Sequence, residues 1–283
     1  MNKNFFLCII SLCLGCTNYS QFNTVVDLPK QLKEVSGVEV TAKSDLLWMH
    51  NDGGNKSKLY LVNSEGKIKK EVIINAKNKD WEDITSDEEG TIYIGDFGNN
   101  NNTRKDLVVL KIDKKEISSS KSVEVEKIKF KYPEQTKFPP KKKARFFDAE
   151  SLFYHNGFLY ILTKSRVKKA YGKTSLYKIP AVAGTYEAQF ISSFENCSSS
   201  HCWITAASIS QDDKKVALLT SNSVLLFTDF TGEDFFKGKL TEIDLGFSSQ
   251  KEALDFKDNS TLYITDEKAR GKGGKLYELK LPL

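Results

Sequence analysis

The stretch DWEDI at residues 80–84 places carboxylates between a tryptophan and an isoleucine, where a buried strand normally carries apolar residues. The arrangement returns as DAESL at 148–152 and as KEALDF at 251–256. Alternating apolar residues after each glutamate are typical of a strand with one face in a core. Three strands that begin with a glutamate in the same register indicate a repeated structural unit.

Two further copies of the unit bring the total to five. In each copy, apolar residues follow a polar residue at alternate positions, as in a half-buried strand. The polar residues are Ser36, Glu82, Glu150, Thr205 and Glu252, which lie 46 to 68 residues apart. This spacing is close to that of one four-stranded β-propeller blade per unit.

The rest of each unit also has the pattern of a blade. A polar turn such as YHNG at 154–157 follows the first strand. A second apolar strand comes next, for example FLYILTKSR at 158–166, and then a third, for example SVLLFT at 223–228. A fourth strand, such as KKEVII at 69–74, closes the first four units.

The fifth unit has only three strands, and the segment NTVVDL at 23–28 belongs to no unit. Pairing that segment with the last blade would close the ring and remove exposed sheet edges. We therefore predict an all-β fold, a five-bladed β-propeller over residues 23–283. A six-bladed ring would require another blade within 100–148, a segment that we interpret as strands three and four of blade two plus a long loop.

That loop is YPEQTKFPPKKKARFF at 132–147, which combines paired prolines with a run of lysines. Such runs are typical of solvated loops because like charges repel one another. The alternative is an adhesive patch for an acidic lipid surface or a polyanion.

The N-terminal segment MNKNFFLCIISLCLGC has one positive residue, Lys3, and an apolar run that ends before Gly15 and Cys16. A run this short predicts a signal peptide over 1–15. The segment resembles a bacterial lipoprotein signal, which implies an acylated Cys16, a tether over 16–22 and an exported protein of the cell envelope. The alternative is an ordinary secretory signal. If Cys16 is acylated, we expect the protein to contact the membrane through its lipid anchor only.

The formal net charge of +5 is mild and does not indicate a nucleic-acid partner. Of five cysteines, three belong to the signal segment, which leaves Cys197 and Cys202 in NCSSSHC. Two nearby cysteines in an exported chain predict a disulfide. A metal site formed by this pair and His201 would lack a fourth ligand.

In a propeller, the first strand of each blade lines the central channel, and consecutive strands run antiparallel. The start of strand one and the end of strand two therefore lie on the same face. This predicts a ring of Ser36, Glu82, Glu150, Thr205 and Glu252 around the axis. Around its mouth we expect the ends of the second strands, which carry His50, Asn51, Asp52, Asp96, Asn99, Lys164, Arg166, Ser221, Asn222, Asp266, Glu267 and Lys268.

Three carboxylates in a poorly hydrated channel require a compensating positive charge. Calcium fits this set, because it takes 6–8 oxygen ligands and accepts carboxylates, hydroxyls and water together. Zinc fits badly in a chain with only three histidines. The alternative is a structural plug, in which the glutamates pair with Lys164, Arg166, Lys251 or Lys268.

The motifs VSGVEV, DWEDI, DAESL, WITAASI and KEALDF, one per unit over residues 35–256, resemble those of the calcium-dependent apyrases. Weaker likenesses extend to esterase-like and phytase-like propellers of exported bacterial proteins. The first resemblance implies a five-bladed propeller with a central calcium that hydrolyses nucleoside di- and triphosphates. It also implies metal ligands at Ser36, Glu82, Glu150, Thr205 and Glu252, with threonine at 205 where the apyrase pattern has serine.

The expected function is therefore a calcium-dependent hydrolase of phosphoanhydrides or phosphoesters that takes a small polar or phosphorylated ligand. Lys164 and Arg166 would stabilise charge on a phosphoryl group, and Asp52 or Asp96 would orient the attacking water. Lactone or ester hydrolysis at the same metal differs only in substrate. The rival hypothesis is a non-catalytic propeller that holds a glycan, a peptide or a partner at the mouth, with calcium purely structural.

Overall fold

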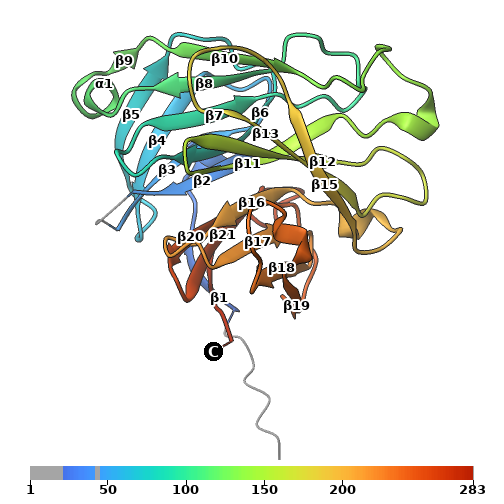
Figure 1. Ribbon diagram of the computed structural model, residues 1–283. Coiled ribbons are helices and arrows are strands. Elements are labelled where there is room, and N and C mark those ends of the chain that lie inside the picture. Colours follow the sequence, from blue (N-terminus) through green and yellow to red (C-terminus); the bar gives the residue numbers. More distant parts are fainter. Residues whose placement is uncertain (1–21, 42–44, 283) are drawn as a thin grey trace, which may run out of the picture.

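The computed structural model describes residues 22–41 and 45–282. The predicted signal peptide and Cys16 lie outside the described residues. Five sheets, each with four antiparallel strands, form the blades of a propeller (Figure 1). The predicted five-bladed fold is thus confirmed. Among the described residues, no helix is long and apolar enough to cross a membrane.

Each blade begins with its innermost strand and proceeds outward. Blade 1 contains β2 (Val35–Val40), β3 (Leu46–Asn51), β4 (Lys58–Asn63) and β5 (Ile68–Ile74), and blade 2 contains β6 (Trp81–Ser86), β7 (Ile92–Asp96), β8 (Val108–Ile112) and β10 (Glu126–Lys131). Blade 3 contains β11 (Asp148–His155), β12 (Phe158–Lys164), β13 (Lys173–Pro180) and β15 (Gln189–Glu195). Blade 4 contains β16 (Ala206–Ile209), β17 (Lys215–Leu219), β18 (Ser223–Thr228) and β19 (Lys239–Asp244), and blade 5 contains β20 (Lys251–Asp258), β21 (Thr261–Asp266), β22 (Lys275–Lys280) and β1 (Phe22–Asp27).

The N-terminal strand closes the ring. β1 pairs antiparallel with β22, from Phe22 opposite Leu279 to Asp27 opposite Lys275, and so becomes the fourth strand of blade 5. Figure 1 shows the blue β1 beside the red C-terminal strands. The last blade therefore has no open edge on its β22 side, as the sequence predicts.

Two short strands add a fifth position to blades 1 and 2. β9 (Ser122–Val123) pairs in parallel with β5, and β14 (Gly184–Glu187) pairs in parallel with β10. The segment 100–148 contains β8 and β10 of blade 2, the short strand β9, the helix α1 (Lys114–Ser119) and the predicted loop. It forms no separate blade, so the six-bladed alternative is wrong.

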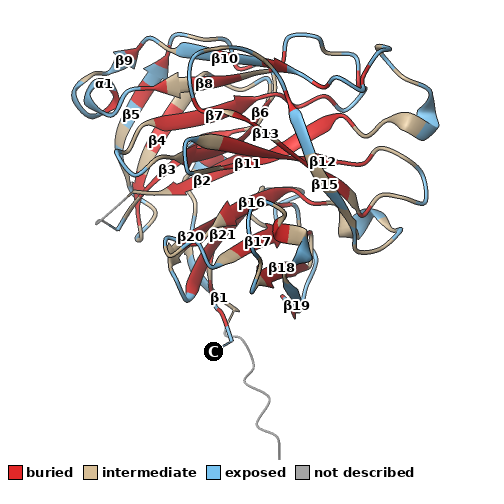
Figure 2. Ribbon diagram, viewed as in Figure 1, coloured by how far each residue is buried: buried red, intermediate tan, exposed pale blue. Residues whose placement is uncertain are grey.

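Apolar side chains fill the spaces between neighbouring blades. The cluster between blades 2 and 3 contains Tyr93, Phe130, Leu152 and Ile161, all at most 3% exposed. Figure 2 shows this burial in the inner and middle strands, whereas β10 and β15 near the rim are partly exposed. Burial of these faces supplies the main favourable term for folding.

Buried carboxylates connect the innermost strands of neighbouring blades around the channel. Asp83 accepts hydrogen bonds from the N–H of Ile84 at 2.9 Å and from Leu152 of blade 3 at 3.0 Å. Asp255 accepts from Ser208 Oγ at 2.6 Å and from the N–H of Val40 at 2.7 Å. Because the channel edge of an inner strand has no neighbouring strand, these side chains satisfy N–H groups that would otherwise be unpaired.

Candidate functional site

β-Bulges turn the predicted ring residues towards the channel. The pairing of the first two strands shifts between Val35 and Gly37, and the same irregularity occurs in blades 2, 3 and 5. A bulge leaves an extra residue unpaired and re-aims its side chain. The residues within the shifts are Ser36, Glu82 with Asp83, Glu150 and Glu252.

All five ring residues line one pocket of about 370 Å³. The pocket brings together the carboxylates of Glu82, Glu150 and Glu252 with the hydroxyls of Ser36 and Thr205. From the predicted mouth it adds Asp52, Lys164, Arg166, Ser221 and Glu267. The geometric expectation of a central polar site is thus met, although the roles of its residues remain predictions.

Lys164 and Arg166 are ion-paired on one wall of this pocket. Lys164 Nζ lies 2.9 Å from Glu150 Oε2, and Arg166 lies 3.0 Å from Glu150 Oε1 and also contacts Asp148. Burial on its own would raise the pKa of Glu150, but attraction to the two basic groups outweighs it and holds that pKa below its usual range. Glu150 therefore behaves as the structural-plug hypothesis predicts.

The other predicted plug cations do not pair with the glutamates. Lys251 is fully buried, and its Nζ donates to the backbone oxygens of Ser221 at 3.0 Å and Phe247 at 2.9 Å. It also donates to Ser249 Oγ at 3.1 Å. Lys268 is exposed and forms no ion pair with a described residue. Glu82 and Glu252 are consequently left without a basic partner in direct contact.

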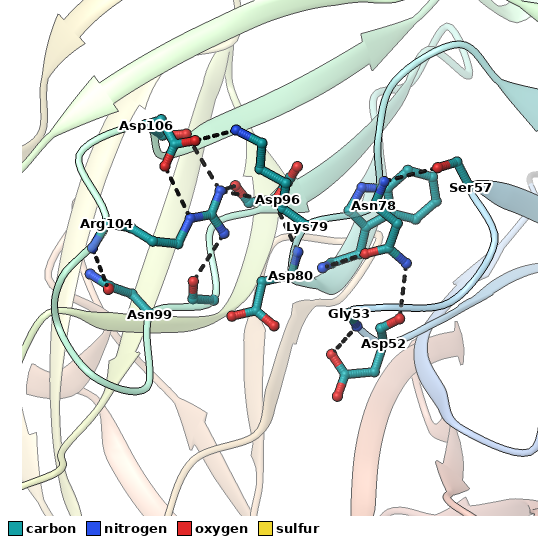
Figure 3. Close-up of polar contacts among 12 residues, drawn as sticks. Asp52, Gly53, Ser57, Asn78, Lys79, Asp80, Asp96, Asn99, Arg104 and Asp106 are labelled. Carbon is teal, nitrogen blue, oxygen red and sulfur yellow. Dashed lines mark hydrogen bonds and ion pairs between the residues drawn. The ribbon is translucent and has the colours of Figure 1, made fainter.

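An acidic cluster forms beside the pocket, where Asp52 and Glu82 belong to the lining and Asp80 lies just outside it. Ligand oxygens of Asp52, Asp80 and Glu82 all lie within 4.8 Å of one another. Burial raises the pKa of Asp52 to about 6, and burial with repulsion from Glu150 raises the pKa of Glu82 well above its usual value. Figure 3 shows Asp52 and Asp80 without an ion pair to any residue drawn.

The cluster is positioned by backbone contacts around Asn78. The Asn78 side chain donates to the backbone oxygens of Asp52 at 2.9 Å and Asn51 at 3.2 Å, and accepts from the N–H of Trp81 at 3.1 Å (Figure 3). Because Asn78 is 3% exposed, these bonds are shielded from water. The linker between blades 1 and 2 is thereby held against the end of β3.

Gly98 leaves the space that the carboxylates occupy. A Cβ atom at this position would lie 2.0 Å from Glu82 Oε1 and 2.5 Å from Asp80 Oδ2. Such contacts are far below ordinary van der Waals separation, so a larger residue at this position would require both carboxylates to move away.

Two more carboxylates with raised pKa values face the same pocket. Burial raises the pKa of Glu252 to about 7 and of Glu267 to about 8, and neighbouring carboxylates contribute in both cases. The pocket lining contains five carboxylates, Asp52, Glu82, Glu150, Glu252 and Glu267, against three basic groups, Lys164, Arg166 and Lys251. With all eight groups ionised, and without counting Asp80, which lies outside the lining, the formal charge would be −2, which one divalent cation would offset.

Asp96 lies behind the cluster and does not line the pocket. Its Oδ1 pairs with Arg104 at 3.0 Å and accepts the N–H of Asp80 at 3.2 Å (Figure 3). Asp96 therefore supports the backbone that carries Asp80.

The hydroxyl groups of the ring connect blades. Ser36 Oγ donates to the backbone oxygen of Glu82, and Thr205 Oγ1 donates to that of Lys251 at 2.7 Å. Each hydroxyl oxygen keeps lone pairs that a cation could use.

The disulfide predicted from sequence is present between Cys197 and Cys202. It removes both sulfurs from metal binding, so the alternative site with His201 is wrong. The loop leads into Trp203, whose Nε1 donates to Ser165 O at 2.6 Å and whose ring lies 5.1 Å from the Arg166 guanidinium. Trp203 forms a wall of the pocket, although the sequence analysis did not select it.

Neither a family model nor a curated protein matches the chain. A gluconolactonase from Xanthomonas campestris matches with a TM-score of 0.51 and 11% identity, covering 93% of this chain and 90% of its own. A PQQ-bound aldose sugar dehydrogenase from Streptomyces coelicolor matches with a TM-score of 0.51 and 9% identity, covering 92% and 98%. A virginiamycin B lyase from Staphylococcus aureus covers 90% of this chain and 69% of its own, with 14% identity and a TM-score of 0.42. The first two likenesses show a shared propeller fold.

Proposed function

We propose that this protein binds calcium in its central pocket and is a hydrolase of small polar esters, phosphoesters or phosphoanhydrides. The observation that carries the proposal is the cluster of Asp52, Asp80 and Glu82, whose ligand oxygens lie within 4.8 Å of one another and which forms no ion pair with a basic group of the described residues. Carboxylates this close repel one another, and a cation among them would favour their ionised forms. The proposed ligand set therefore lies to one side of the predicted ring and includes Asp80.

The donor set fits calcium. The cluster offers carboxylate oxygens, and Glu252, Ser36 and Thr205 add further oxygens to the same pocket. Calcium accepts such a mixture in a flexible geometry. Of the three histidines, His50 is fully buried away from the pocket lining, and neither His155 nor His201 belongs to that lining. Zinc is therefore disfavoured.

The opposite wall can hold the negative end of a ligand. Among the described residues, Lys164 Nζ donates a hydrogen bond only to Glu150. Arg166 uses its Nε and Nη2 groups, and its Nη1 donates to no described residue. These remaining donors can bind a carbonyl or phosphoryl oxygen, and the Trp203 ring can cover an apolar part of the ligand.

A bound calcium would polarise the carbonyl or phosphoryl oxygen of the ligand. Glu267 is the proposed group that takes a proton from the attacking water, because it faces the pocket and its raised pKa is close to neutral pH. The sequence suggested Asp52 or Asp96 as the group that orients the water. We assign Asp52 to the cation instead, and Asp96 is bound to Arg104 outside the pocket lining.

Metal analysis of the purified protein and hydrolysis assays test this proposal. We expect about one calcium per chain, and turnover of at least one of three substrates, a nucleoside diphosphate, a phosphomonoester or a lactone, that stops in chelator. Absence of bound metal, together with equal melting curves in calcium and in chelator, would exclude the cation and the hydrolase.

A non-catalytic binding propeller is the second candidate, and the position of Trp203 favours it. An aromatic side chain on a pocket wall is common where proteins hold sugars or partners. A Glu267→Gln variant distinguishes the two functions. A hydrolase loses turnover and keeps ligand binding, whereas a binding protein shows no turnover before or after the substitution.

The same proposal places the protein in the bacterial cell envelope, exported and held by lipid on Cys16. The apolar run that ends at Gly15 and Cys16, and the disulfide, support an exported protein. Replacing Cys16 with serine should release the protein from membranes. Unchanged retention would contradict the anchor.

A further inference from the structure

A second pocket, of about 470 Å³, lies on blade 2 outside the central site. Its apolar floor contains Leu110 and the half-buried Val108 of β8, with the half-buried Ala76 beside them, whereas Leu107 and Phe130, which also line the hollow, belong to the core between blades 2 and 3. One wall is the segment Ala76–Lys79 before β6, and the other is the outer strand β10. The pocket is comparable in volume to sites that bind small organic molecules.

Lysines surround this floor. Lys127, Lys129 and Lys131 occupy alternate positions of β10, so their side chains leave the same face of the strand. Lys77, Lys79 and Lys105 add three more from the opposite side. The arrangement combines an apolar floor with a cationic rim, which is the complement of an amphipathic anion.

The carboxylates in the pocket do not neutralise this rim. Its two acids, Asp96 and Asp106, lie together at one end and pair with Arg104 and Lys79 (Figure 3). Since two basic groups balance these two acids, the other lysines of the rim keep their charge.

Most of those lysines have no acidic partner. Lys131 contacts Glu187 at 3.0 Å, but both side chains are exposed, and such pairs contribute little. Lys77, Lys127 and Lys129 form no ion pair with any described residue, and Lys105 Nζ lies 5.2 Å from the Phe138 ring. The whole chain carries a formal charge of only +5, so this rim is a local concentration of positive charge.

The apolar floor continues beyond the first hollow. A neighbouring hollow of about 250 Å³ shares Lys105, Leu107, Phe130 and Lys131 with it and adds Phe138. An extended apolar trough suits a flexible hydrocarbon chain better than a compact anion. A polyanion would use the lysines and leave this floor uncovered.

We propose that this trough binds an amphipathic organic anion of the fatty-acid type. Lys127 and Lys129 hold the acidic head group, and Leu110 and Val108, their cross-strand partners on β8, cover the hydrocarbon chain. The head group gains attraction from three or more lysines, and the chain is removed from water. This binding is independent of the central cation pocket.

Decanoate is the probe, and its binding is measured by calorimetry in low salt with chelator, below its micelle concentration. Decanol carries the same chain without charge, and inorganic phosphate carries charge without the chain. We expect decanoate to bind at least about tenfold more tightly than either, and its affinity to fall as salt screens the lysines. Equal affinity for decanol would mean adsorption to apolar surface, and equal affinity for phosphate a plain anion site. Either result, or no decanoate binding, overturns the proposal.

Two variants locate the site. Lys127→Gln with Lys129→Gln should weaken decanoate binding about tenfold or more, because each lost charge removes attraction to the head group. The matched control is Lys239→Gln with Lys280→Gln, two exposed strand lysines without ion pairs to described residues. Val108→Trp, which fills the trough, should also abolish binding. Unchanged binding by the β10 variant, or an equal loss in the control, contradicts the assignment.

Discussion

At the scale of single residues, the absence of a side chain at Gly98 is as important as any carboxylate. Gly98→Ala should reduce calcium affinity by more than about tenfold, because the new methyl group would occupy the space of Glu82 Oε1 and Asp80 Oδ2. Calorimetric titration with calcium measures the effect. Asn101→Ala, an exposed substitution in the same loop, is the control and should titrate as the wild type. A Gly98→Ala protein with wild-type affinity would place the cation elsewhere.

Glu82 and Glu150 hold equivalent sequence positions, yet they should respond differently to loss of charge. Glu82→Gln should weaken calcium binding about tenfold or more and reduce the rise in melting temperature that calcium produces. Glu150→Gln should cost about 3 kcal/mol of unfolding free energy with or without calcium, because Lys164 and Arg166 lose a buried partner. Melting curves of both variants in calcium and in chelator measure this contrast. The reverse pattern would assign calcium to the axis of the ring.

Sequence alone could predict the ring residues, because each is polar where a strand otherwise alternates with apolar residues. It could not predict Asp80 or Asn78, since their positions depend on how the linker between two blades folds against β3. The pairing of Asp96 with Arg104 was equally hidden, because a loop returns Arg104 to the end of β7. Contacts of this kind depend on loop conformation, which the alternation of apolar and polar residues does not predict.

At the scale of elements, the loop of Cys197 and Cys202 carries Trp203 to the pocket wall. Replacing both cysteines with serine should lower the unfolding free energy by about 2 kcal/mol, since the loop that the bond closes is short. Denaturant unfolding of the non-reduced protein measures this value. Ligand binding should fall by a larger factor than stability alone explains, because the tryptophan loses its fixed position. Full ligand affinity in the serine variant would remove Trp203 from the proposed site.

The bulges explain why the sequence predicted where the inner strands lie but not how their residues pair with the second strands. Apolar alternation predicted every first strand. The extra residue at the bulge, such as Glu150 between Ala149 and Ser151, changes which side chain faces the channel. Because of this extra residue, the glutamate faces the channel while the next apolar residue of the strand still faces the core.

At the scale of the whole molecule, the buried carboxylates make stability depend on pH. Asp52, Glu252 and Glu267 have pKa values of about 6, 7 and 8 in the folded protein, whereas they titrate near 4 when unfolded. The folded state therefore binds more protons between these limits, and its stability falls as pH rises through that range. In chelator the melting temperature should decrease from about pH 5 to pH 8, measured by thermal unfolding. Calcium should oppose the decrease, and a flat profile in chelator would show that these groups are not buried.

The number of blades could be predicted because each blade repeats one strand pattern and the leftover N-terminal strand matches the missing fourth position. The parallel strand β14 could not, since it lies in the chain between two strands of blade 3 and pairs with blade 2. The four residues of β14 show no apolar alternation, so the sequence does not indicate which strand they pair with.

The direction of β1 decides how the molecule would stand on a membrane. Asp27, at its end, lies in the row of Lys275, Asp266 and Lys251 beside the pocket. The backbone of Phe22, at its start, pairs with Leu279 in the row at the other end of the blade, although its ring reaches back to 5.9 Å from Lys251 Nζ. The six residues of this strand span roughly 17 Å. With the proposed lipid on Cys16, the bilayer would lie beneath the face where the chain enters, and the mouth would point outward. Ligands would then reach the pocket by diffusion through the aqueous compartment and would not have to cross the membrane.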